Sequence, residues 1–298
     1  GAAEGGLCIV GGGTRGLAVD GQKLATAGLS GITLYEPGAL TMVARAGTPL
    51  REIEAALADA GQMLAFEPRV LRGLTGAGQG STIGGVFATN SSGPRRVAVG
   101  GARDFLLGVR FVDGAGNVVK NGGRVMKNVT GYDLVKLMAG AQGTLGVLSE
   151  VSFKVLPRPE TQASLMIYGP DGRQAVAIMA RALGSAFEVT GAWHSSRTRA
   201  GYPVTILRVE GFEASVAYRV ERLKSLIAPM IADQSSHEIT VMRDAPEVAA
   251  QWRSICDLGE QDGTPFDMWK ISTKPSDAPG LVAKLPDGTR YMFDWGGG

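Results

Sequence analysis

The sequence predicts an α+β protein with two domains, a glycine-dense ligand-binding domain over residues 1–158 and a ferredoxin-like domain over residues 159–298. Nine glycines fall within residues 73–101, where apolar residues are interleaved with them, so this stretch is not a flexible linker. The apolar pattern changes after "LPRPE" at residues 156–160, and the segments that follow have the order βαββαβ. The two halves of the chain are therefore expected to be separate domains.

The composition excludes several classes of function. The net charge is +2 and no run of five like charges occurs, which argues against a nucleic-acid surface or a polybasic membrane anchor. Two distant cysteines provide neither a disulfide framework nor a zinc or iron–sulfur site, so no metal is expected. No apolar stretch reaches the ~20 residues of a membrane helix. Free thiols among apolar neighbours indicate a reducing compartment, and the expected location is cytoplasmic.

The first domain begins with strands and one helix. Short β-type runs separated by glycine-rich turns predict strands at residues 7–10, 32–36 and 41–47. A helix is expected next, with Thr48 as its N-cap, Pro49 in its first turn and Gly61 as its stop.

The rest of the first domain is predicted from turn and capping signals. Alternating residues on both sides of Asp113-Gly114-Ala115-Gly116 predict a hairpin over residues 106–120. "TGYDLVKLMAG" predicts a short helix with Thr130 and Asp133 in capping-box positions. A long strand over residues 144–157 then leads to the expected domain boundary.

The second domain follows the ferredoxin-like order. Its first helix is expected over residues 172–183 behind an Asp171 cap, and its second over residues 215–228. Strands are predicted at residues 163–169, 188–194, 203–211 and 237–243. A further helix near Pro246 and strand-like pieces at residues 268–273, 281–285 and 290–296 complete the chain.

The stretch "CIVGGGTRG" places Gly11, Gly13 and Gly16 at G-x-G-x-x-G spacing after an apolar run, with Glu36 about 20 residues further on. A nicotinamide-binding Rossmann unit would need a helix directly after this loop. Residues 17–31 contain three glycines and no sustained apolar stripe, so a stable helix is not expected there. A loop that cradles a pyrophosphate through main-chain donors is the favoured hypothesis. A nicotinamide site and a purely structural glycine turn stay as alternatives.

Three motifs in order carry a resemblance to a known family. "VGGGTRG", "GSTIGGVFATNSSGPRR" and "GTLGV" together resemble the FAD-binding domain shared by vanillyl-alcohol oxidase and p-cresol methylhydroxylase relatives. Within that superfamily the chain resembles the smaller FAD-binding subunit of bacterial three-subunit glycolate oxidase. The resemblance implies a two-subdomain PCMH-type FAD-binding domain followed by a cap domain. It also implies that the chain lacks a strand and helix before the first glycine loop and the end of the cap.

The resemblance implies a set of cofactor-binding residues in the three motifs. These are Gly11, Gly12, Gly13, Thr14, Arg15 and Gly16, then Gly76, Thr82, Gly84, Gly85, Thr89, Asn90 and Gly93, and finally Gly143, Gly146 and Val147. Relatives that attach FAD covalently use a His or Cys in the first two loops, and these segments contain neither. The expected cofactor is therefore non-covalent FAD.

The implied activity is oxidation of glycolate, or a similar 2-hydroxy acid, to the keto acid, with electrons passing through FAD to an iron–sulfur subunit. A larger FAD-binding catalytic sibling subunit is the other implied partner, and a peripheral location at the inner membrane through these partners is an alternative to the cytoplasmic one. Oxidation of this kind needs a cation for the carboxylate, and the candidates are Arg124, Lys127 and Lys270, while Tyr132 is a candidate for the ring edge. No convincing base is found, because the chain has only two isolated histidines. A non-catalytic FAD electron-transfer or assembly subunit therefore stays open, as does, less favoured, a nicotinamide-dependent dehydrogenase.

Overall fold

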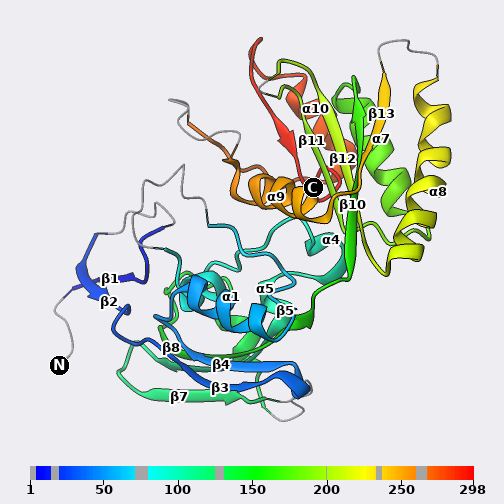
Figure 1. The fold of residues 1–298 in the computed structure, drawn as a ribbon. Coiled ribbons are helices and arrows are strands. Elements are labelled where there is room, and N and C mark those ends of the chain that lie inside the picture. The colour runs from blue at the N-terminus through cyan, green and yellow to red at the C-terminus, as the bar shows by residue number, and fades with distance from the viewer. Residues whose placement is uncertain are drawn as a thin grey trace. The chain divides into compact units, whose positions relative to one another are not determined.

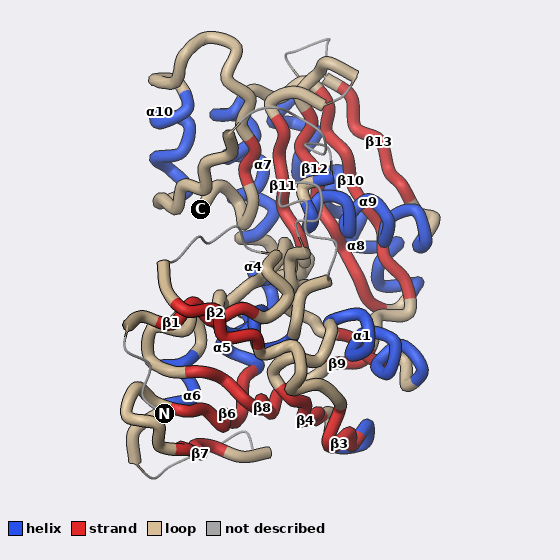
Figure 2. Tube along the Cα trace, turned by 90° about the vertical axis from the view of Figure 1, so that its left-hand side faces the viewer, coloured by secondary structure: helices blue, strands red, loops and turns tan. Residues whose placement is uncertain are grey.

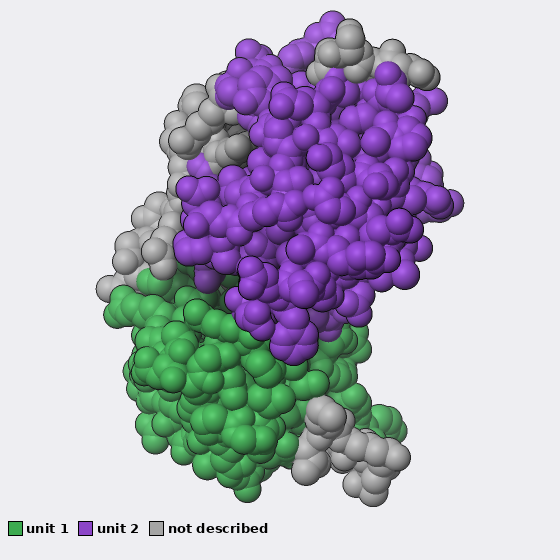
Figure 3. Space-filling model, turned by 45° about the vertical axis from the view of Figure 1, so that its right-hand side comes forward, with its two compact units in different colours: residues 1–93, 100–158 green, residues 94–99, 159–298 purple. Residues whose placement is uncertain are grey.

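The computed structural model describes residues 5–14, 20–70, 80–124, 131–198, 200–232, 237–259 and 267–298. By contacts the chain divides into two compact units, residues 1–93 with 100–158, and residues 94–99 with 159–298 (Figure 3). Five residues singled out in the sequence lie outside the described ranges, namely Arg15, Gly16, Gly76, Lys127 and Thr130.

The first unit is built on a five-stranded antiparallel sheet. Its order is β3 (Ile32–Glu36), β4 (Thr41–Arg45), β8 (Val147–Lys154), β6 (Leu106–Val112) and β7 (Val118–Gly122) (Figure 1). The remaining elements of this unit are η1 (Pro37–Ala39), α1 (Leu50–Asp59), the pair β5 (Gln62–Met63) and β9 (Leu156–Pro157), α3 (Ile83–Ala88), α5 (Ala102–Phe105) and α6 (Leu134–Met138). Aromatic rings join α3 to the sheet, because Phe87 lies 5.5 Å from Phe153 and 5.7 Å from Phe66 between ring centroids. This core fixes the position of the α3 backbone.

The first glycine loop follows β1 (Leu7–Val10), which pairs in parallel with β2 (Gln22–Ala25); the two strands lie side by side in Figure 2. A Rossmann unit would have a helix where β2 and the following turn lie. The expectation that residues 17–31 form no such helix is confirmed for residues 20–31, the described part of that stretch.

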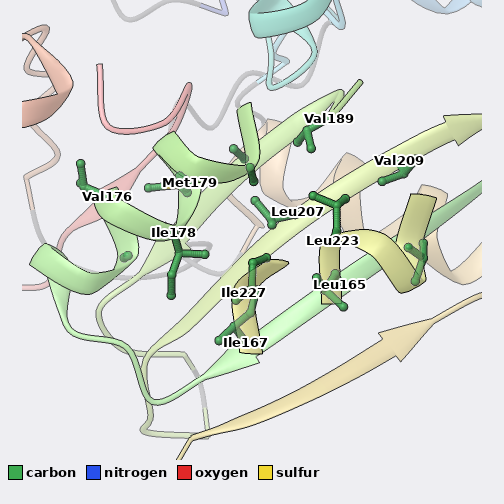
Figure 4. Close-up of a cluster of buried hydrophobic side chains, with 14 of the residues drawn as sticks. Leu165, Ile167, Val176, Ile178, Met179, Val189, Leu207, Val209, Leu223 and Ile227 are labelled. Carbon is green, nitrogen blue, oxygen red and sulfur yellow. The ribbon is translucent and has the colours of Figure 1, made fainter. Parts of the chain in front are cut away.

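The second unit has a five-stranded sheet with the order β13 (Glu238–Met242), β10 (Thr161–Tyr168), β12 (Val204–Gly211), β11 (Gly191–Ser195) and β14 (Met292–Phe293). The first four strands are antiparallel to their neighbours, and with α7 (Gly172–Leu183) and α8 (Glu213–Ile231) they follow the predicted βαββαβ order. Leucines, isoleucines and valines from α7, α8 and the sheet form one core (Figure 4). On the opposite face α9 (Ala245–Asp257) packs Trp252 against Trp193 and Ile206.

Four local predictions are wrong. Asp133 is itself the N-cap of α6, where its side chain accepts from the Lys136 amide at 3.0 Å, and not the third residue of a capping box that begins at Thr130. Pro49, with φ −60° and ψ 137°, is the N-cap of α1, because the Thr48 hydroxyl bonds instead to the carbonyls of Gly31 and Arg45. Residues 268–273 form no strand, and residues 281–285 contain the end of α10 (Ala278–Val282) and a turn. Short apolar runs fit helix, strand or extended coil, and only their neighbours decide which forms. The short helix α4 (Arg96–Val99) and the turn η3 (Pro275–Asp277) also belong to the second unit.

Candidate functional site

A cleft of about 180 Å³ in the first unit gathers parts of all three glycine motifs. Most of its walls come from the end of β1 with the first loop, from residues 81–89 around α3, and from residues 138–148, which run from the end of α6 into β8. The lining residues are Ile9, Val10, Gly11, Gly12, Gly13, Thr14, Thr26, Ala46, Ser81, Thr82, Gly84, Gly85, Ala88, Thr89, Met138, Gln142, Gly143, Gly146 and Leu148. Ile9 and Leu148, which are 139 positions apart in the sequence, are thus joined at one site.

The first loop lies directly against the segment that precedes α3. A Cβ on Gly12 would collide with the Gly80 carbonyl oxygen, and a Cβ on Gly11 would collide with the Thr82 hydroxyl. The buried Thr14 hydroxyl lies 2.9 Å from the Ser81 hydroxyl and links the same two segments. These glycines are therefore needed for close approach of the two loops to each other.

The segment at the start of α3 is held by main-chain hydrogen bonds to residues that follow β4. The amide of Ile83 donates to the Thr48 carbonyl at 3.0 Å, and the amide of Gly84 donates to the Ala46 carbonyl at 2.8 Å. Thr82 caps α3, since its hydroxyl accepts from the Gly85 amide at 3.3 Å. A Cβ added to Gly84 would lie 2.6 Å from the Cβ of Ala46, so this position also needs glycine for packing.

The third segment turns through left-handed backbone conformations. Gln142 has φ 53°, and its amide donates to the Ala88 carbonyl at 2.8 Å, which joins this segment to the end of α3. Gly143 and Gly146 follow with φ 83° and 151°. Such φ values are strained for residues that carry a Cβ.

The donor set suits a nucleotide with a diphosphate. Glycine main chain, neutral polar side chains and the apolar side chains of Ile9, Val10, Ala46, Ala88, Met138 and Leu148 line the cleft, and no charged side chain is among its described lining residues. A carboxylate there would repel phosphate, whereas main-chain amides and hydroxyls can donate to its oxygens. None of the described lining residues is His or Cys, the residue types expected of a covalent flavin attachment. The residues present therefore fit the expected dinucleotide.

Ten of the predicted cofactor residues line this cleft, namely Gly11, Gly12, Gly13, Thr14, Thr82, Gly84, Gly85, Thr89, Gly143 and Gly146. Asn90, Gly93 and Val147 do not line it: the Asn90 side chain accepts from the Arg103 amide at 2.9 Å, and the Gly93 amide donates to the Phe66 carbonyl at 2.9 Å. Sequence reasoning missed the lining residues Ile9, Val10, Thr26, Ala46, Ser81, Ala88, Met138, Gln142 and Leu148. Ser81 lay within a quoted motif, but the sequence carried no sign that Thr26 or Met138 would reach the site.

The candidate catalytic residues with described positions are not among the residues that line the cleft. The exposed side chains of Arg124 and Glu36 form an ion pair at 3.1 Å. Glu36 thus has a partner that is unrelated to the acidic position of a nicotinamide site. Tyr132 is 87% exposed, and Lys270 belongs to the second unit, where its Nζ lies 5.0 Å from the centroid of the Trp295 ring. None of these three lines the cleft.

His194, one of the two histidines, is enclosed in the second unit. Its Nδ1 lies 3.0 Å from the Thr205 hydroxyl, and its ring stacks on Phe293 with centroids 5.7 Å apart. Burial lowers the pKa of His194 to about 4, so its ring is neutral at physiological pH. No group of three or more His, Cys, Asp or Glu that could hold a metal ion occurs among the described residues. None of their helices is long and apolar enough to cross a membrane.

A family model described as FAD binding domain matches residues 3–122. Glycolate oxidase subunit GlcE of Escherichia coli (strain K12) is 38% identical over 287 residues, which cover 95% of this chain and 70% of that protein. Glycolate oxidase subunit GlcD of Bacillus subtilis (strain 168) is 42% identical over 86 residues, which cover 29% of this chain and 18% of that protein.

Solved structures show the same fold at low sequence identity. An alkyldihydroxyacetonephosphate synthase matches with a TM-score of 0.65 and 16% identity, over 85% of this chain and 50% of that one. p-Cresol methylhydroxylase with substrate bound matches with a TM-score of 0.62 and 13% identity, over 86% of this chain and 59% of that one. The chain thus spans about half the length of these two proteins.

Proposed function

The chain belongs to the PCMH-type FAD-binding family, in the group that contains glycolate oxidase subunit GlcE, and on that premise we propose that it binds FAD non-covalently in the glycine-lined cleft. The observation that carries the proposal is the convergence of all three glycine motifs on one cleft whose described lining residues are uncharged. FAD, when bound, supplies a two-electron acceptor for oxidation of a C–H bond next to a hydroxyl.

The chain's own residues have distinct tasks in this proposal. Gly11, Gly12 and Gly13 present main chain to the diphosphate, and the Thr14 hydroxyl keeps this loop on the segment that carries Ser81. The α3 segment and the turn at residues 142–146, which a hydrogen bond joins, also line the cleft. Since these contacts are main-chain contacts, they orient the cofactor without adding a titrating group.

For the reaction we propose that the chain is an FAD-binding subunit of a complex that oxidises glycolate to glyoxylate. Its proposed partners are a larger FAD-binding sibling subunit and an iron–sulfur subunit that accepts the electrons. The names of the relatives support this, because two of them are glycolate oxidase subunits.

A second candidate function is an FAD electron-transfer or assembly subunit whose sibling handles the substrate. The enclosure of His194 favours it, because a ring stacked on Phe293 with a pKa of about 4 is a poor base for a hydroxyl proton. Within the first unit, neither Arg124 nor Tyr132 lines the cleft, which favours it as well.

A visible spectrum tests both functions. The chain is incubated with FAD, passed through a desalting column and scanned, and flavin bands are expected to stay with the protein and to be released by acid precipitation. Absence of these bands would refute the FAD proposal, and bands retained in the precipitate would refute the non-covalent part. Anaerobic glycolate is then added. Bleaching by glycolate alone supports a catalytic subunit. Bleaching that requires the sibling subunit, and that exceeds the amount of flavin the sibling itself carries, supports the electron carrier.

A further inference from the structure

Residues 94–99 connect the proposed FAD site to the second unit. The chain leaves the first unit after Gly93, contributes these six residues to the second unit, and returns to the first at Gly100. We name residues 94–99 the strap. It contains the short helix α4, which packs against β11 of the second unit.

The base of the strap is tied together within the first unit. The Ala102 amide donates to the Ser92 hydroxyl at 2.9 Å, and the Arg103 amide donates to the Asn90 side chain at 2.9 Å. Thr89, one residue before this base, lines the cleft. The same short stretch of chain therefore builds one wall of the proposed FAD site and the base of the strap.

Arg95, the second residue of the strap, forms a buried ion pair with Glu210. The Arg95 guanidinium donates from Nε and Nη2 to the two Glu210 carboxylate oxygens, at 2.9 and 2.5 Å. Both side chains are more than nine-tenths buried, with exposures of 8% and 6%. Arg208 lies 3.5 Å from the same carboxylate and over the Trp252 ring, and Arg96 lies over the Trp295 ring at 4.9 Å. A bidentate pair of this kind fixes both position and orientation.

We infer that Arg95 is a positioning residue for the FAD site: its pair with Glu210 fastens the strap to the second unit, and the strap in turn fixes residues 89–93 beside the cleft. This inference rests on the proposed binding of FAD. Because the strap is short and tied at both ends, binding at the cleft is coupled to the stability of the second unit. Loss of the anchor uncouples the two.

The tryptophans make this coupling measurable. All four, Trp193, Trp252, Trp269 and Trp295, belong to the second unit, so their emission reports its unfolding, whereas FAD is proposed to bind to the first unit. Urea unfolding is followed by the tryptophan emission maximum, with and without saturating FAD. The variant is Arg95→Gln, and the control is Arg243→Gln, which removes an exposed ion pair with Glu221 in the same unit.

Saturating FAD is expected to raise the tryptophan-monitored midpoint of the wild type and of Arg243→Gln, but not of Arg95→Gln. The Kd for FAD, from a fluorescence titration, is expected to rise about fivefold or more in Arg95→Gln. If Arg95→Gln does not fold, Arg95→Lys, which keeps the charge and loses one hydrogen bond, is expected to show a reduced shift. If a folded Arg95 variant shows the same FAD-dependent shift as the wild type, the inference about Arg95 is overturned and the proposed function stands. The same holds if FAD binds to the wild type but does not move its midpoint. Failure of the wild type to bind FAD would overturn the proposed function and this inference with it.

Discussion

His194 makes the second unit sensitive to acid in a defined pH range. Burial lowers its pKa to about 4 in the folded chain, against the ordinary value of 6.5. Between pH 4 and pH 6.5, therefore, His194 is mostly protonated in the unfolded chain and mostly neutral in the folded chain. Stability is fully present above pH 6.5 and is lost as the pH falls toward 4. The pKa difference corresponds to about 3 kcal/mol in full, of which about 2.5 kcal/mol is lost by pH 4.5.

The assay is urea unfolding at pH 7.0 and 4.5, followed by tryptophan emission, in the wild type and in His194→Gln. The variant is expected to be less stable at pH 7 and to lose about 2.5 kcal/mol less than the wild type between the two pH values. Glu210 does not confound the comparison. Burial raises its pKa, but Arg208 and Arg95 lower it to about 2, so most of its contribution is lost below pH 4.5, and the part that is lost above pH 4.5 is the same in both proteins. Equal pH dependence in the two proteins would refute the assignment of the lowered pKa to His194.

The remaining predictions concern the loops and one cap. Gly12→Ala is expected to abolish FAD binding, because the added methyl group meets the Gly80 carbonyl. Gly85→Ala is expected to leave folding intact, because the added methyl group meets only a capping hydroxyl at 3.3 Å. Equal thermal melts and equal FAD titrations for the two variants would contradict this. Thr14→Val removes a buried hydroxyl contact of 2.9 Å and should lower the free energy of unfolding of the first unit by about 1 kcal/mol. The measurement is urea unfolding followed by far-UV circular dichroism, and a gain in stability would contradict the prediction. Asp171→Ala removes a side chain that caps two amides of α7 at 2.8 Å and should cost about 1 kcal/mol in tryptophan-monitored unfolding, whereas no loss would show that the cap contributes little.

The second unit could be predicted from the sequence in most of its elements because its signals are local. Alternating apolar residues in β10 and β12 face two different cores, and Asp171 caps α7 as expected. Residues 268–273 have the same apolar content but form no strand, since Trp269 and Ile271 are exposed there. Strand formation needs a neighbouring strand with free edge groups, and no property of the segment itself records whether one is present.

The glycines of the cleft show where reasoning from the sequence met its limit. Their density predicts close approach of main chain to something large, but it does not say to what. At Gly11, Gly12 and Gly84 the added Cβ would first meet other parts of this chain, whereas Gly85 would meet only the hydroxyl that caps its own helix. The first three positions therefore assemble the cleft whether or not a ligand is present, and Gly85 is the position at which a small side chain tests the ligand itself. A loss of FAD affinity in a normally folded Gly85→Ala variant would thus be direct support for the cofactor lying along α3.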